Sequence, residues 1–154
     1  MKETTLTKEE AMAKAASLAH DYKLQGYHCS ESAVRAVPEA LGLKLSDDTV
    51  KAATGFFGGG GGMRDRCGIV EIGLMLISLE FGRLDPKPSD QDIRDMAAEL
   101  FARFEKKFGS IYCRDVKPPE VERFGEEYGC MRIYEEGSAL LTELMLDADK
   151  ILGK

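Results

Sequence analysis

The segment from Asp65 to Phe81 constrains the fold of this chain most, because it carries apolar residues on nearly every side of the helix it would form. These residues are Ile69, Val70, Ile72, Leu74, Met75, Leu76, Ile77 and Leu79. A helix of this kind is buried among other elements over most of its surface. Interrupted by Gly73 and Ser78, the apolar run is far shorter than the roughly 20 residues that cross a bilayer. The sequence therefore predicts a central, buried helix and no membrane insertion.

Helical spacing of apolar residues and helix-capping signals recur along the rest of the chain. Thr7 and Glu10 match a capping box, and Ser89 and Asp92 resemble one. We expect the other helices at residues 7–26, 30–42, 46–53, 89–109, 118–125 and 131–151. No alternating pattern is long enough to predict a strand. Residues 1–154 thus predict one all-α domain, a bundle of about six to seven helices with a glycine-rich loop before the central helix.

The charge of the chain excludes several kinds of partner. Its formal net charge is −6, whereas nucleic acid and anionic membranes both attract basic surfaces. The first ten residues contain no apolar stretch of the kind found in secretory signals, so we expect a cytoplasmic location. In that compartment, cysteines are more often catalytic, redox-sensing or metal-binding than structural disulfides.

The four cysteines, Cys29, Cys67, Cys113 and Cys130, are the candidate functional residues. Cys29 precedes the second predicted helix, Cys67 lies in the first turn of the central helix, and Cys130 precedes the last helix. Cys113 falls in a predicted connection. A helix N-terminus stabilises a thiolate and lowers the pKa of the thiol, and the thiolate is both the nucleophile and the metal ligand. A single cysteine is often a small buried hydrophobe, but none of these four lies within an apolar helical stripe.

The cysteine spacing leaves the mechanism open. No Cys-x-x-Cys pair is present, which excludes a thioredoxin-type redox pair and a zinc-ribbon pattern. Four converging thiolates would suit an iron–sulfur cluster or tetrahedral zinc, whereas two pairs would suit thiol–disulfide exchange with an unidentified redox partner. In the exchange version, we expect Cys67 to be the thiol of low pKa. A helical interaction module with inert thiols is a further alternative, and the apolar central helix also permits a homodimer.

A run of five glycines, Gly58, Gly59, Gly60, Gly61 and Gly62, precedes Cys67. Backbone amides of such a loop can hold an anion, but neither a Walker lysine nor a preceding strand supports a nucleotide site. We interpret the loop as backbone that passes close to Cys67 or to a bound cofactor. Arg64 and Arg66 add positive charge there, and Arg66 joins the five glycines as a candidate cofactor-binding residue. His28, beside Cys29, either tunes that thiol, serves as a further ligand or caps a helix.

The order of these features resembles the C_GCAxxG_C_C family of redox-active proteins, over roughly residues 6–152. In this resemblance the family's cysteines correspond to Cys29 in Gly-Tyr-His-Cys-Ser, Cys67 in Arg-Cys-Gly-Ile-Val-Glu-Ile-Gly, Cys113 in Ile-Tyr-Cys-Arg and Cys130 in Gly-Cys-Met. The resemblance implies a redox role carried by all four thiols.

The chain departs from the family motif after the Cys-Gly pair. Ile69 stands at the alanine position, Ile72 stands at the second glycine position, and Gly73 comes one residue late. Small residues at those positions would allow close helix packing or close approach of a cofactor, so the packing around the central helix is the feature that this departure affects.

Overall fold

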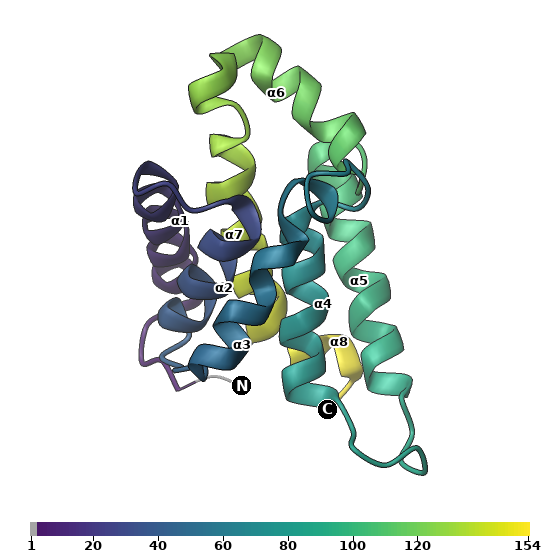
Figure 1. Ribbon diagram of the computed structural model, residues 1–154. Coiled ribbons are helices and arrows are strands. Elements are labelled where there is room, and N and C mark those ends of the chain that lie inside the picture. The colour runs from purple at the N-terminus through teal and green to yellow at the C-terminus, as the bar shows by residue number, and fades with distance from the viewer. Residues whose placement is uncertain (1–2) are drawn as a thin grey trace.

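The computed structural model describes residues 3–154 and shows an arrangement of helices without strands in that range (Figure 1). Met1 and Lys2, which begin the segment inspected for a secretory signal, lie outside the described residues. The elements are α1 (Lys8–Leu24), α2 (Cys29–Ala40), α3 (Asp47–Ala52), the 3-10 helix η1 (Ala53–Gly59), α4 (Gly68–Phe81), α5 (Gln91–Phe108), α6 (Cys113–Tyr128), α7 (Met131–Leu146) and α8 (Ala148–Leu152). The all-α prediction is confirmed, and the last predicted helix is divided into α7 and α8 at Asp147. Within residues 3–154, none of the helices combines the length and apolar character that a membrane crossing requires.

Helix α4 is the central helix that the apolar segment predicts. It contacts α2, η1, α5 and α7, and half of its residues are buried (Figure 1). The buried residues are Gly68, Ile69, Val70, Ile72, Gly73, Leu76 and Ile77. Neighbouring helices of the same chain therefore cover most of the apolar positions, while Leu74 and Met75 are partly buried and Leu79 is exposed.

The N-terminal part of the chain forms a second packing layer, in which α1 lies against α2 and α7. The face of α1 toward these helices consists of small side chains, since its buried residues are Ala11, Ala15 and Ala19. The predicted capping box is present: the Glu10 N–H donates to Thr7 Oγ1 at 3.1 Å, and the Thr7 N–H donates to Glu10 Oε2 at 2.9 Å. It fixes the start of α1 at Lys8.

Two close helix contacts of α4 explain the departure from the family motif. A Cβ added at Gly73 would lie 2.7 Å from Leu100 of α5 and 2.8 Å from Leu141 of α7. A Cβ added at Gly137 of α7 would lie 2.9 Å from Cγ2 of Ile69. The small residue required opposite position 69 is therefore on the neighbouring helix, which leaves space for an isoleucine in α4.

Three predicted helix starts are wrong. Helix α4 begins at Gly68, three residues after the predicted Asp65, so Cys67 precedes the helix instead of lying in its first turn. The Ser89 hydroxyl accepts from the Gln91 N–H at 3.1 Å, so α5 begins one residue after Asp90 without the expected box. Helix α6 begins at Cys113, well before the prolines at 118 and 119. The N–H groups of residues 115 and 116 both bond to the Tyr112 carbonyl, which starts the helix ahead of the prolines. Cys113 is consequently a helix N-terminal residue. Gly125 (φ 82°, ψ 170°) is non-helical and divides α6 into two helical stretches, so the first stretch ends where the sequence predicts.

Candidate functional site

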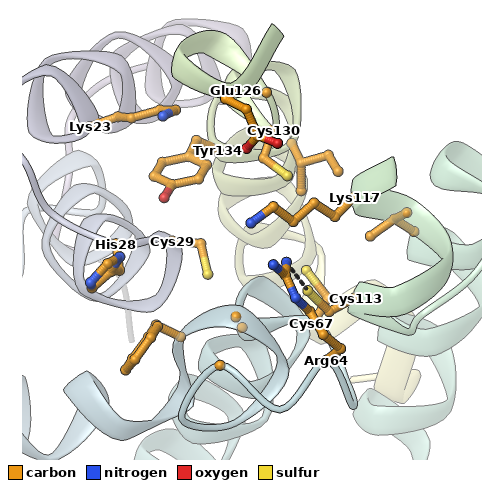
Figure 2. Close-up of a pocket in the computed structure, with 17 residues that line it drawn as sticks. Lys23, His28, Cys29, Arg64, Cys67, Cys113, Lys117, Glu126, Cys130 and Tyr134 are labelled. Atoms are coloured by element: carbon orange, nitrogen blue, oxygen red, sulfur yellow. Dashed lines mark hydrogen bonds between the residues drawn. The ribbon is translucent and has the colours of Figure 1, made fainter. Parts of the chain in front are cut away.

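The structure brings the four cysteines around one cavity of about 300 Å³ (Figure 2). Cys29 is the first residue of α2 and Cys113 the first of α6, whereas Cys67 and Cys130 immediately precede α4 and α7. Each thiol is thus carried by the N-terminal end of a different helix. Three long stretches of sequence separate the thiols, so the site exists only in the folded chain.

A short antiparallel backbone pairing holds Cys67 and Cys113 near one another. The Cys67 N–H donates to the Ile111 carbonyl at 2.8 Å, and the Cys113 N–H donates to the Asp65 carbonyl at 2.7 Å. Arg66 and Tyr112 form the β-bridge between these two bonds. Because successive side chains of extended backbone point to opposite sides, the two thiols share one side of the pairing and Arg66 lies on the other. Cys67 and Cys113 both line the cavity, and Arg66 does not.

Arg66 is engaged elsewhere. Its guanidinium forms a hydrogen-bonded ion pair with Glu71 and lies 5.4 Å from the Phe101 ring centroid. Arg64 is the arginine that lines the cavity, and its Nη1 lies 3.8 Å from Cys113 Sγ as a hydrogen-bond donor. Arg64 adopts a left-handed backbone conformation (φ 64°), which departs from the alternation that turns Arg66 away.

The glycine run forms a tight loop next to the cavity. Gly58 and Gly62 line the cavity, whereas Gly59, Gly60 and Gly61 do not. At Gly59 (φ 78°), an added Cβ would lie 2.4 Å from the Asp65 nitrogen, so only glycine fits where the loop meets the segment leading to Cys67. Cofactor binding by the five glycines remains a prediction. The close contact of Gly59 with the segment before Cys67 explains why the loop needs a glycine there.

The glycine directly after Cys67 lets a second thiol approach. A Cβ added at Gly68 would lie 2.7 Å from Cys29 Sγ and 2.8 Å from the Phe56 carbonyl oxygen. The Cys29 sulfur therefore contacts the first turn of α4, and backbone hydrogen bonding from Gly58 also reaches it. The loop that we expected to pass close to Cys67 thus approaches Cys29 as well.

Burial controls the protonation of three of the thiols. It raises the pKa of Cys29 and Cys67, and it raises the pKa of Cys130 to about 11. Negative charge on Cys29 further raises the pKa of Cys67 and Cys130. Backbone hydrogen bonds from Ile69 and Val70 act in the opposite direction on Cys67, but with less effect. The expectation of a low pKa for Cys67 is wrong, because loss of hydration outweighs the helix N-terminus.

The cavity is locally positive although the chain is acidic. Lys23, Arg64 and Lys117 line it, and Glu126 is the single carboxylate among its lining residues. Lys23 is held by a 3.0 Å hydrogen bond to the Glu127 carbonyl oxygen. Within residues 3–154, no ion pair is formed by Arg64 or Lys117, whose charges therefore face the thiols without a bound carboxylate (Figure 2).

The sequence analysis did not select Lys117 or Tyr134, which both line the cavity. Each lies four residues after a cysteine, Lys117 after Cys113 and Tyr134 after Cys130. That spacing places both members of a pair on one face of a helix. The four-residue spacing from Cys130 could therefore have identified Tyr134 from the sequence. The same spacing identifies Lys117 only if α6 is known to begin at Cys113.

The positions of the four cysteine side chains differ from those of a metal centre. Zinc bound by four cysteines needs Zn–S distances of about 2.3 Å, which requires the sulfurs to be nearly in contact. Across residues 3–154, no three His, Cys, Asp or Glu side chains are grouped closely enough to hold a metal ion. All four cysteines are also free thiols. The donor set suits a thiolate-bound metal in kind, but the geometry of these side chains does not fit one.

His28 does not complete a ligand set. Its ring stacks on Phe57 with the centroids 4.4 Å apart, and both residues line the cavity. The Glu31 carboxylate accepts a hydrogen bond from the His28 N–H at 3.1 Å, at the start of α2. The histidine therefore forms part of the wall beside Cys29.

An all-α fold with four helix-terminal thiols around one cavity makes the thiols the centre of the candidate site. The family model described as "Putative redox-active protein (C_GCAxxG_C_C)" matches residues 27–144, which include all four cysteines, and the chain belongs to this family. The resemblance seen in the sequence is thereby confirmed. Comparison with curated proteins and with solved structures found no match.

Proposed function

We propose that residues 1–154 form a single cytoplasmic redox domain that takes up and releases electrons in pairs by thiol–disulfide exchange. The observation that carries the proposal is the convergence of four free thiols on one cavity. Membership of a family described as redox-active supports it. No part of the proposal requires a bound metal.

The chemistry uses the thiols in pairs. Oxidation of two thiols forms one S–S bond and releases two electrons and two protons, which convert an incoming disulfide into two thiols. Cys67 and Cys113 are the first pair, because the backbone pairing at Arg66 and Tyr112 holds their segments together. Cys29 and Cys130 are the second pair, because both pack against one small cluster that includes Tyr134.

Arg64 distinguishes Cys113 from the other thiols. Arg64 Nη1 donates to Cys113 Sγ at 3.8 Å, which places a cation directly beside this sulfur. Burial keeps Cys29, Cys67 and Cys130 protonated near neutral pH. We therefore assign the attacking role to Cys113 in place of Cys67.

An iron–sulfur electron carrier is the second candidate. Four cysteine thiols facing one cavity are the ligand type that such clusters use, and Arg64 and Lys117 would offset the negative charge of a thiolate-bound cluster. The spacing of the side chains disfavours a cluster, and the same spacing leaves all four thiols free of disulfide bonds, so the family's description as redox-active is what favours exchange.

Anaerobic purification followed by thiol counting separates these functions. The protein is equilibrated with mixtures of reduced and oxidised dithiothreitol, alkylated, and analysed by peptide mass spectrometry. We expect thiols to disappear two at a time, with Cys67 and Cys113 lost together first, and Cys113→Ser to abolish that first step. Stoichiometric iron and sulfide would establish the cluster instead, and four thiols that stay unoxidised until the protein unfolds would establish an inert helical module.

A further inference from the structure

A second, more open hollow of about 540 Å³ lies along α6 outside the cysteine cavity. We call it the outer groove, and its lining residues are Arg64, Cys113, Arg114, Lys117, Pro118, Val121, Glu122 and Glu126. Cys113 is the one cysteine among them, whereas all four cysteines line the inner cavity. Cys113, which is 7% exposed, is therefore the cysteine that the outer groove shares with the inner cavity.

The outer groove has an excess of positive charge in a chain whose net charge is −6. Arg64, Arg114 and Lys117 supply three cations, against the two carboxylates of Glu122 and Glu126. Arg114 also pairs with Asp65 at 3.2 Å and lies 4.3 Å from the Tyr112 ring centroid, but the Arg114 and Asp65 side chains are 55% and 72% exposed, so their ion pair is weak in water. The cations beside Cys113 are thus available to an incoming anion.

The size of the outer groove suits a small molecule. Ligand pockets span about 300 to 1,000 Å³, and the groove lies within that range. Pro118 and Val121 give one wall apolar surface, which the carbon chains of a small organic molecule would contact. The Cys113 thiol favours a disulfide as the ligand. The neighbouring cations favour acidic groups on it, and the apolar wall favours an organic molecule.

We propose that the outer groove binds a low-molecular-weight disulfide bearing carboxylates and that Cys113 is the catalytic residue that reacts with it. This inference rests on the proposed thiol–disulfide exchange and adds its substrate class and its entry point. Arg64, Arg114 and Lys117 bind the carboxylates, and the inner thiols receive the disulfide from Cys113.

The reaction balances in two steps. The Cys113 thiolate attacks one sulfur of the substrate, an S–S bond forms to Cys113, and the substrate S–S bond breaks to release one thiolate. That thiolate takes up a proton. The Cys67 thiol then gives up its proton and attacks Cys113 Sγ, which forms the Cys67–Cys113 disulfide and releases the second half of the substrate as a thiol. In sum, one substrate disulfide and two protein thiols become two substrate thiols and one protein disulfide.

The charge of the substrate provides the first test. The reduced protein is mixed with dithiodiglycolate, hydroxyethyl disulfide or cystamine, which are anionic, neutral and cationic, and each rate is divided by that of free mercaptoethanol with the same disulfide. We expect the normalised rate for the anion to exceed that for the cation about tenfold at low salt, with the difference shrinking as salt screens the groove. Equal normalised rates for the three disulfides, in a protein that oxidised dithiothreitol still oxidises normally, would reject the groove but leave the redox function standing.

Matched variants provide the second test. Arg114 lines the outer groove but not the inner cavity, whereas Arg123 is exposed on the same helix and lines neither. We expect Arg114→Gln to lower the anion-to-cation rate ratio about threefold and Arg123→Gln to leave it unchanged. Equal effects of the two variants would reject a local site in favour of the net charge of the protein. Failure of every disulfide to oxidise any thiol would reject the proposed function itself.

Discussion

At the scale of single residues, each thiol experiences two opposed effects. The N-terminal end of a helix stabilises the thiolate, and burial stabilises the neutral thiol. Burial prevails at Cys29, Cys67 and Cys130, as the raised pKa of each shows. A four-thiol site can therefore persist in reduced form without three neighbouring negative charges repelling one another.

The reactivity of Cys130 should follow its raised pKa. A group whose folded pKa is above its ordinary value keeps its proton to higher pH, so the thiolate fraction at Cys130 is small at neutral pH and rises up to about pH 11. We expect alkylation of Cys130 by iodoacetamide to accelerate about tenfold per pH unit between pH 8 and about 10. Peptide mass spectrometry of the quenched protein measures it. The urea-unfolded chain is the control, and equal rates in the folded and unfolded protein at pH 8 would contradict the pKa shift.

Replacing Gly68 by a larger residue should destabilise the protein because of the close contact with Cys29. In Gly68→Ala the added Cβ meets Cys29 Sγ and the Phe56 carbonyl, so we expect a loss of about 1–3 kcal/mol in unfolding free energy. Urea denaturation of the reduced protein measures the loss. Gly55→Ala is the matched control, since a Cβ at Gly55 has no atom within 4 Å among the described residues. Similar losses in both variants would show that the contact with Cys29 is not the cause.

At the scale of helices, the large side chain of Ile69 on α4 packs against Gly137 on α7, and this contact can be tested by changing both residues. We expect Gly137→Ala to cost about 1–3 kcal/mol in unfolding free energy, because its Cβ would overlap the Ile69 methyl group. Ile69→Ala alone should cost about 2–5 kcal/mol by leaving a cavity. The double variant should cost less than the sum of the two, with a coupling of about 1 kcal/mol or more in urea denaturation. Strict additivity would show that the two residues do not share this space.

Helix α6 should open more readily than the rest of the bundle. It arches across one end of the molecule between α5 and α7 (Figure 1). Residues 121–128 contribute no buried side chain. Few buried contacts mean a low free energy of local opening. We expect the amides of residues 121–128 to exchange with deuterium about tenfold or more faster than those of α4, as measured by peptide mass spectrometry. Equal protection of both segments would contradict this.

Helix positions were predictable where local signals determine them. The pattern around Thr7 fixed the start of α1, and the apolar residues from Ile69 to Leu79 identified the central helix. Prolines at 118 and 119 misplaced the start of α6, because bonds from residues 115 and 116 to the Tyr112 carbonyl start the helix earlier and the distant Asp65 carbonyl accepts from the Cys113 N–H. Arg66 as a cofactor-binding residue remains a prediction, although the pairing with Tyr112 turns its side chain away from the cavity that Arg64 lines.

At the scale of the whole molecule, the site depends on bringing residues 29 to 130 together. No local pattern states that four helix N-termini meet, so the convergence followed only from the family resemblance and from the structure. A homodimer remains a prediction. The apolar faces of α4 that suggested it are contacted by α2, η1, α5 and α7 of the same chain.

Oxidation should stabilise the whole fold. A Cys67–Cys113 disulfide would close a loop of about 45 residues and remove about 4 kcal/mol of chain entropy from the unfolded state. We expect the Tm of the oxidised protein to exceed that of the reduced protein by about 10 °C. Calorimetry with and without oxidised dithiothreitol measures this, and Cys113→Ser should remove the difference. An unchanged Tm in a protein shown to carry the disulfide would mean that bond formation strains the native state by a similar amount.

The contact between Ile69 and Gly137 also has an evolutionary consequence. In this chain a bulky residue on α4 is possible only because α7 has no side chain opposite it. A relative that keeps alanine at the position of Ile69 is released from that restriction and can carry a larger residue at the position of Gly137. Variation at the two positions should therefore be correlated across the family, and ancestral replacements should have occurred at Gly137 first, because the reverse order passes through an overcrowded intermediate.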